Sequence, residues 1–440
     1  MTKFQITVLG IFILCIVAGV AAFALFKGNS ASQAQLPAIT VWGTLSDQKF
    51  NNFTTELNAV NGQQYKINYI QKAESAFNQD FVQALARADG SAPDAILIPQ
   101  DMILQNENKL LLIPYTALPQ RTFLDTYVPE ANLYLRTDGI TALPFAIDPL
   151  VMYWNRDTFT NAGVASAGTI SKPLHWSNFQ SLGTKMTQKD NNSNIQKSVV
   201  ALGQFGNLDH ARDVLGTLLL QAGNPVTIRN TTDTGVVSTL GNGAYRGSNS
   251  SAAAVAFFVR FTNPSDPLYS WNRSLPDSQS FFLSGNLATY FGFASELNDI
   301  RNKNPNLNFD VAPMPQPDQG QIRSTYGRMY GFSLVKASPN ASAAYTILNS
   351  LITPDALATW TKATFLPPVR RDMISAGTTD PYLAIFYDAA LISRSWLDPS
   401  PQGTVGIFQN MIESVTSGSS RLSDAIQTAS DALDLSIKNI

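Results

Sequence analysis

Cysteine, histidine and charged side chains are all scarce in this 440-residue sequence. Its single cysteine excludes a disulfide within the chain, so stability must come from packing. The two histidines, His175 and His210, lie far apart and show no zinc-site spacing. Charged residues make up only 14%, with a formal net charge of −2. This composition gives no sign of the basic surface that a nucleic-acid partner requires.

Familiar catalytic motifs are missing as well. The sequence has no P-loop and no G-x-S-x-G nucleophile elbow, and Gly241-Asn242-Gly243 lacks the spacing of a dinucleotide-binding loop. Asp148 and Glu296 could in principle act as the carboxylate pair of a glycosidase, but nothing in the sequence fixes their separation. We therefore predict a protein that is not an enzyme and that needs no cofactor or metal.

The N-terminus carries the one long apolar run, residues 4–26. It is long enough to span a bilayer, which takes ~20 residues, whereas the apolar core of a cleaved signal has ~7–15. We predict a transmembrane signal anchor at 4–26 and a flexible tether at 27–37, with the globular part outside the cytoplasm. The alternatives are a cleaved signal and a lipoprotein acylated at Cys15, although Leu14 stands where a small residue is expected.

Strands and helices alternate in the first part of the chain beyond the tether. Residues 38–43 (AITVWG) and 94–99 (DAILIP) are typical of buried strands, and helical spacing of apolar residues separates them. This order predicts a parallel α/β sheet, and the chain length predicts two domains. Because ligands bind beyond the carboxyl ends of such strands, we expect a site near residues 43–47 and 99–101.

The central segment 139–164 reads GITALPFAIDPLVMYWNRDTFTNAGV. Pro144 and Pro149 lack the backbone donor, so neither half is expected to form an ordinary central strand through those points. Two interpretations remain open from the residues alone: a strand that crosses between domains near Asp148, or a buried strand within one domain.

Two local predictions concern the segments that follow. Ser177 and Gln180 have the spacing of a capping box at the start of a helix. Residues 227–250 are rich in Gly, Asn, Thr and Ser, which predicts a long surface loop.

A family resemblance rests on several of these segments together. The "LP", "YWN" and "KPLHW" motifs of 139–176, "QSFFLSG" followed by "LATYFGF", and "FDVAPMPQP" resemble the extracellular solute-binding proteins of ABC importers, especially the sugar-binding, maltose-binding-protein-like group. The similarity runs from about Ile39 to the C-terminus. It implies an α/β, two-lobed periplasmic-binding-protein-like fold with three interlobe crossings. The implied division is lobe 1 at 38–147 plus 318–350 and lobe 2 at 148–317 plus 351–440.

The resemblance also implies a function. A small solute, in the first place a sugar or oligosaccharide, would bind between the lobes, and the closed, monomeric protein would deliver it to an ABC permease in the membrane. Two alternatives are kept: a surface glycan-processing enzyme or adhesin, and a binder of a polyamine or another non-sugar solute.

Candidate ligand-binding residues follow from matching positions. Asp101 could instead cap a helix, and Trp396 could be a packed aromatic. Ile98 replaces an aromatic of maltose-binding protein, and Ala294 falls near another, which argues against a malto-oligosaccharide platform. The ten candidates are Thr44, Ser46, Asp101, Asp148, Gly292, Phe293, Glu296, Arg328, Tyr330 and Trp396.

Overall fold

The computed structural model describes residues 38–61, 66–87, 89–164, 174–230, 235–241, 243, 245, 250–318 and 322–440. The expected anchor at 4–26 and tether at 27–37 lie outside these residues. No helix in the described ranges is long and apolar enough to cross a membrane. Chain contacts separate Met1–Ala38 from a compact unit, Ile39–Ile440, that holds every described helix and strand.

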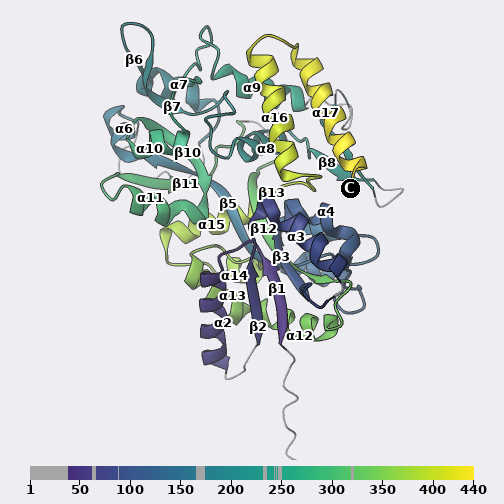
Figure 1. Cartoon of the computed structure of the whole chain (residues 1–440). Coiled ribbons are helices and arrows are strands. Elements are labelled where there is room, and N and C mark those ends of the chain that lie inside the picture. The colour runs from purple at the N-terminus through teal and green to yellow at the C-terminus, as the bar shows by residue number, and fades with distance from the viewer. Residues whose placement is uncertain are drawn as a thin grey trace, which may run out of the picture. The chain divides into compact units, whose positions relative to one another are not determined.

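A mixed sheet of eleven strands runs through this unit (Figure 1). The strands are β1 (Ile39–Gly43), β2 (Ile67–Gln71), β3 (Ala95–Pro99), β4 (Leu110–Leu111), β5 (Leu143–Asn155), β6 (Gln188–Lys189), β7 (Ile195–Val200), β10 (Leu287–Phe293), β11 (Phe309–Ala312), β12 (Thr325–Val335) and β13 (Ser393–Arg394). Their order is β2-β1-β3-β12-β5-β10-β7-β6, with β4 and β13 on β12 and β11 on β5. β1 pairs in parallel with β2 and β3, which confirms the predicted parallel start of the sheet.

Helices connect the strands, and several begin where the sequence supplies a cap. Thr353, Asp380 and Ser400 each accept a backbone N–H bond, and each is followed by a proline in the first turn. The helices are α2 (Asp47–Asn61), α3 (Glu74–Arg87), α4 (Ile103–Asn106), α5 (Gln120–Thr126), α6 (Arg156–Asn161), α7 (Asn178–Met186), α8 (Ala211–Gln221), α9 (Ser250–Arg260), α10 (Ser278–Leu283), α11 (Leu297–Lys303), α12 (Ala341–Leu351), α13 (Pro354–Thr364), α14 (Arg371–Ser375), α15 (Pro381–Ile392), α16 (Pro401–Thr416) and α17 (Leu422–Lys438), with short 3₁₀ turns η1 (Gln100–Met102), η2 (Glu107–Lys109), η3 (Pro129–Tyr134) and η4 (Ala294–Glu296).

The central segment is one continuous strand, β5, buried along its whole length. The expectation that its prolines would interrupt it was therefore wrong. Pro144 lies opposite Gly331, where the register with β12 shifts, and prolines are tolerated at such irregularities. Pairing with β12 ends at Pro149, and pairing with β10 begins at Leu150, so the second missing donor falls where the strand changes partner.

Two large hydrophobic clusters make up most of the core of the described residues, and β5 contributes to both. Phe145 and its neighbours up to Ile147 belong to one cluster, and Leu150 to Trp154 belong to the other. This arrangement favours the crossing interpretation of β5 and agrees with a two-lobed α/β fold. The exact lobe boundaries stay a prediction. Trp360 of α13 packs at 4.8 Å from Phe145, between ring centroids, which favours placing α13 with lobe 1 rather than lobe 2.

Two local predictions need correction. Ser177 precedes α7, but its hydroxyl donates to Asp318 instead of capping the helix, so no capping box forms. The region 227–250 is not simply a loop, because β8 (Thr227–Arg229) and β9 (Val236–Ser238) pair as an antiparallel hairpin. Both runs contain β-branched residues, which favour strands.

Candidate functional site

A cavity of about 770 Å³ lies between the two core clusters and takes its walls from both. Strand β12, helix α3 and Asp148 of the crossing strand β5 supply the wall on the lobe 1 side. The segment leading into α8, the turn η4 and the start of α16 supply the lobe 2 wall. The charged and histidine side chains that line it are Glu74, Asp101, Asp148, Asp209, His210, Arg212, Asp213, Glu296 and Arg328.

The lobe 1 wall is built on the pairing of β5 with β12. Arg328 lies directly opposite Asp148 in the register, and Tyr330 follows two residues further along the same face of β12. The Arg328 guanidinium forms an ion pair with Glu74 at the start of α3 and lies 5.8 Å from the Tyr330 ring centroid. This arginine is therefore held by a carboxylate and by an aromatic face at once.

Asp148 has few hydrogen-bond donors around its carboxylate. Its Oδ1 accepts a 3.0 Å hydrogen bond from the backbone N–H of Ser295, and the nearby Ser295 hydroxyl also stabilises the charged form, whereas no hydrogen bond to Oδ2 from a described residue has ordinary geometry. The side chain is 7% exposed. Burial raises the pKa of Asp148 to about 6, with a smaller contribution from nearby Glu296, while Ser295 and Arg328 act in the opposite direction. A buried carboxylate with few donors is ready to accept a hydrogen bond from a ligand.

Glu296 anchors the lobe 2 wall and is saturated with donors. Its two oxygens accept from the Phe293 backbone N–H (2.7 Å), the Tyr290 hydroxyl (2.7 Å) and the Gln279 amide (2.8 Å), and Oε1 lies 2.8 Å from His210 Nε2. Burial acts to raise the pKa of Glu296, but the bond from His210 leads the opposing interactions, and the net effect lowers it.

His210 occupies a strained position at the entrance to α8. Its backbone has φ 56°, in the left-handed region that residues other than glycine rarely adopt. Its ring meets the Phe293 ring edge-on, with centroids 4.8 Å apart. Burial acts to lower the pKa of His210, but the Glu296 carboxylate outweighs it and raises the pKa. Such strain concentrates at functional sites.

Arg212 joins the two lobes through a buried network. It donates to Asp101 of η1 and to Asp213, both at 2.8 Å, and it also contacts Tyr326 and Asp398. Three carboxylates around one guanidinium hold its pKa well above the ordinary value despite burial. Within the described ranges, no three His, Cys, Asp or Glu side chains are placed to hold a metal ion.

The structure brings six of the ten predicted residues to this cavity and leaves four outside its walls. Trp396 is 1% exposed, donates to Asp398 and packs on Tyr326, which is the arrangement of a core aromatic. The Ser46 hydroxyl accepts from the Lys49 backbone, as a cap would. The six are Asp101, Asp148, Phe293, Glu296, Arg328 and Tyr330, and the four are Thr44, Ser46, Gly292 and Trp396.

Several lining residues escaped the prediction, above all His210, Arg212 and Gln279. One signal was present. Helix α8 is buried at every position, yet it opens with an arginine and Asp213. Charged residues are rarely buried unless they are paired, so this start of a buried helix indicated a polar network.

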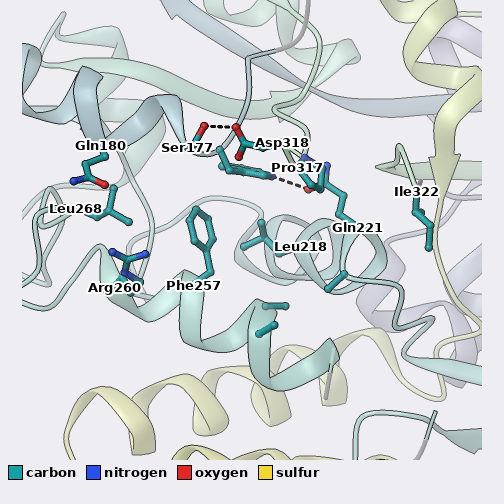
Figure 2. A pocket seen from close by; sticks show the side chains of 14 residues that line it. Ser177, Gln180, Leu218, Gln221, Phe257, Arg260, Leu268, Pro317, Asp318 and Ile322 are labelled. Carbon is teal, nitrogen blue, oxygen red and sulfur yellow. Dashed lines mark hydrogen bonds between the residues drawn. The ribbon is translucent and has the colours of Figure 1, made fainter. Parts of the chain in front are cut away.

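A second hollow of about 880 Å³ lies within lobe 2, between α7, α8 and α9. Figure 2 shows Phe257 and Leu218 on its floor and the Ser177–Asp318 hydrogen bond at its edge. Although it is larger, the Ser177, Gln221, Arg260 and Asp318 side chains that line it already have hydrogen-bond partners, and none of the ten candidates lines it. The interlobe cavity is the better candidate for a ligand site.

The chain matches a family model described as bacterial extracellular solute-binding protein, over residues 50–384. The match spans most of the chain, so the protein belongs to this family, and the class is that of an ABC transporter's solute-binding component. No curated protein matches the chain.

Solved structures with the same fold support this membership. A cyclo/maltodextrin-binding protein complexed with maltotetraose matches with a TM-score of 0.70 at 16% identity, covering 92% of this chain and 98% of the other. A cyclic alpha-maltosyl-1,6-maltose binding protein from Arthrobacter globiformis gives 0.70 at 18% identity, with 92% and 100% coverage. A maltotriose-binding protein from Thermus thermophilus gives 0.64 at 15% identity, with 91% and 100% coverage. At these identities the likeness establishes the fold.

Proposed function

We propose that the protein captures a small solute, in the first place a sugar or oligosaccharide, in the cleft between its lobes. The observation that carries this proposal is the 770 Å³ cavity, whose walls contain side chains of both lobes. A ligand that touches Asp148 and Tyr330 on one side and Phe293 on the other stabilises closure by hinge bending. Sugar complexes of proteins with the same fold favour the sugar assignment.

Delivery to a permease completes this function. In the proposed arrangement, residues 4–26 anchor the chain in the membrane, and 27–37 let the monomeric globular part reach an ABC permease outside the cytoplasm. Only the closed, loaded form would dock productively, because closure changes the relative position of surfaces on the two lobes.

No turnover of the solute is proposed. A glycosidase would need one carboxyl group poised as acid and a second as nucleophile or base. Glu296 already accepts from the Phe293 backbone, Tyr290 and Gln279 and pairs with His210, so it is poorly placed to exchange protons with a substrate. The family and the neighbours with the same fold are binding proteins, which agrees with this view.

A thermal-shift screen of the full chain tests the function. Sugars, oligosaccharides, polyamines and amino acids would be added to the detergent-solubilised protein. A ligand at a hundred times its dissociation constant adds ~2.7 kcal/mol to the free energy of unfolding, which raises the melting temperature visibly. Tyr330→Ala should reduce the shift, because Tyr330 lines the cleft and its ring lies beside the Arg328 guanidinium.

The control for this variant is Tyr387→Ala, a half-buried tyrosine of α15 outside the cleft. An undiminished shift in Tyr330→Ala would place the ligand elsewhere. Release of a modified product, followed by chromatography, would overturn the assignment as a binding protein.

A further inference from the structure

Charge in the cleft is unevenly matched, and from this we infer that the solute carries a primary ammonium group bound by Asp148. This inference rests on the proposed function and specifies the ligand of the same site. An amino sugar and a linear polyamine share this chemistry.

Each cationic group in the cleft already has a carboxylate partner. Arg328 pairs with Glu74, and His210 pairs with Glu296. Arg212 is shared by more than one carboxylate. The residues that line the cleft therefore carry more negative charge than their own cationic groups balance.

The Asp148 carboxylate carries part of this excess negative charge and lines the space that a ligand would occupy. Its Oδ1 accepts from the Ser295 N–H and the Ser295 hydroxyl lies nearby, so among the described residues a single neutral residue supplies the donors for this carboxylate. A buried anion without a full set of donors is costly, and an ammonium group offsets that cost better than a neutral hydroxyl, because charge-assisted hydrogen bonds are roughly twice as strong. Burial is the main cause that raises the pKa of Asp148 to about 6, and the neighbouring Glu296 carboxylate adds to it.

Asp101 provides a second observation on the same wall. Its Oδ2 is held by Arg212, while its Oδ1 is buried and has no hydrogen-bond partner among the described residues. The cleft thus contains two carboxylates with few donors, and both occur on the lobe 1 wall.

Aromatic rings on the cleft walls expose little of their faces. Phe205, Phe293 and Tyr330 line the cleft, but each is only 6 to 7% exposed. The Phe293 ring also meets His210. Stacking of a neutral sugar needs an open ring face, so polar contacts have the larger part in recognition here.

Matched ligand pairs test the ammonium group. Glucosamine and its linear tetramer would be compared with their N-acetylated forms, and spermidine would serve as the linear amine, by calorimetry on the full chain at pH 7. We expect at least one of the amines to bind about tenfold or more tighter than the N-acetylated sugars. This factor is equivalent to 1.4 kcal/mol.

Asp148→Asn is the matched variant, because its side-chain oxygen can still accept from Ser295. It should reduce the preference for the amine to about twofold or less, whereas Asp125→Asn removes an exposed carboxylate, 70% accessible, on α5 and should leave the preference intact. In the wild type, affinity for the amine should fall as the pH drops below about 6, since protonation removes the charge of Asp148. This measurement does not depend on how the variant folds.

The outcomes separate the inference from the function. Tighter binding of the amino sugar or of spermidine supports the ammonium group and identifies its source. Equal binding of amine and neutral sugar, or an undiminished preference in Asp148→Asn, overturns the inference while solute binding stands. Failure of every compound of the wider screen to bind would count against the proposed function itself.

Discussion

Glu130 is a buried carboxyl group away from the ligand-binding walls. It is 1% exposed, and its Oε1 accepts from the Ser395 hydroxyl. Its Oε2 has no hydrogen-bond partner among the described residues. Burial is the main cause that raises the pKa of Glu130 from 4.5 to about 8, and the Ser395 hydrogen bond and nearby Arg394 oppose it only partly. The group is therefore a source of pH-dependent stability.

The sign of this dependence follows from proton binding. Between about pH 4.5 and 8 the folded state keeps a proton on Glu130 that the unfolded state has lost. The free energy of unfolding therefore falls as the pH rises through this window, by at most ~1.4 kcal/mol per pH unit from this group. Glu130→Gln cannot ionise, so it should lose this slope and become the more stable form toward pH 8. Urea unfolding at several pH values measures both slopes.

Glu413→Gln is the control, because Glu413 is exposed on α16. It should follow the wild-type pH dependence. If Glu130→Gln kept the wild-type slope between pH 5 and 8, Glu130 would not be the buried, protonated group described.

Site residues were predictable where the chain itself carries the pattern. Asp148 stands before a proline in a long apolar segment, so its burial follows from the sequence, and the family resemblance made it a candidate. His210 and Arg212 could not be assigned in the same way, because their partners Glu296 and Asp101 are distant in the chain. The role of Trp396 could not be decided from the sequence, because a tryptophan can stack on a sugar or pack in a core equally well.

At the scale of elements, α8 carries a glycine where a larger residue does not fit. A Cβ added at Gly216 would lie 2.5 Å from the buried ring of Trp396. Tyr326 and Phe408 pack against that ring, which leaves it little room to shift. The glycine thus permits close packing of α8 on the segment after β13.

We expect Gly216→Ala to destabilise the protein by about 1–3 kcal/mol, because overpacking exceeds the gain of ~1 kcal/mol in helix propensity. Gly406→Ala is the matched control, since no atom lies within 4 Å of a Cβ at that position in α16. It should stabilise by about 0.5–1 kcal/mol. Thermal unfolding compares the two. A stabilised Gly216→Ala would show that Trp396 is not fixed in place.

Elements with strong local patterns were predicted well, and those decided by tertiary pairing were not. The buried runs of β1 and β3 are strands, as expected. β5 continues through Pro144 and Pro149, because a register shift and a change of partner absorb both missing donors. Neither the register shift nor the change of pairing partner can be predicted from the sequence. The hairpin β8–β9 was missed because its strands are only three residues each.

At the scale of the whole molecule, the two core clusters share strands. β5 contributes to both, and β12 places Tyr326 in one and Phe332 in the other. The buried Arg212–Asp101 ion pair adds a further connection between the lobes. A protein of this size often unfolds in steps, but shared strands and a buried ion pair couple the clusters.

We therefore expect residues 39–440 to unfold as one cooperative unit. Phe53→Ala removes a fully buried ring that lies 5.5 Å from Trp360, between centroids, and should cost about 3–5 kcal/mol. Hydrogen exchange followed by mass spectrometry should then show reduced protection in α8, in the other cluster, as well as in α13. The reciprocal variant is Phe258→Ala in α9, which should lower protection in α13 and α8 alike. Loss of protection confined to the altered cluster in both variants would mean that each lobe unfolds alone, and that hinge strands transmit no stability between them.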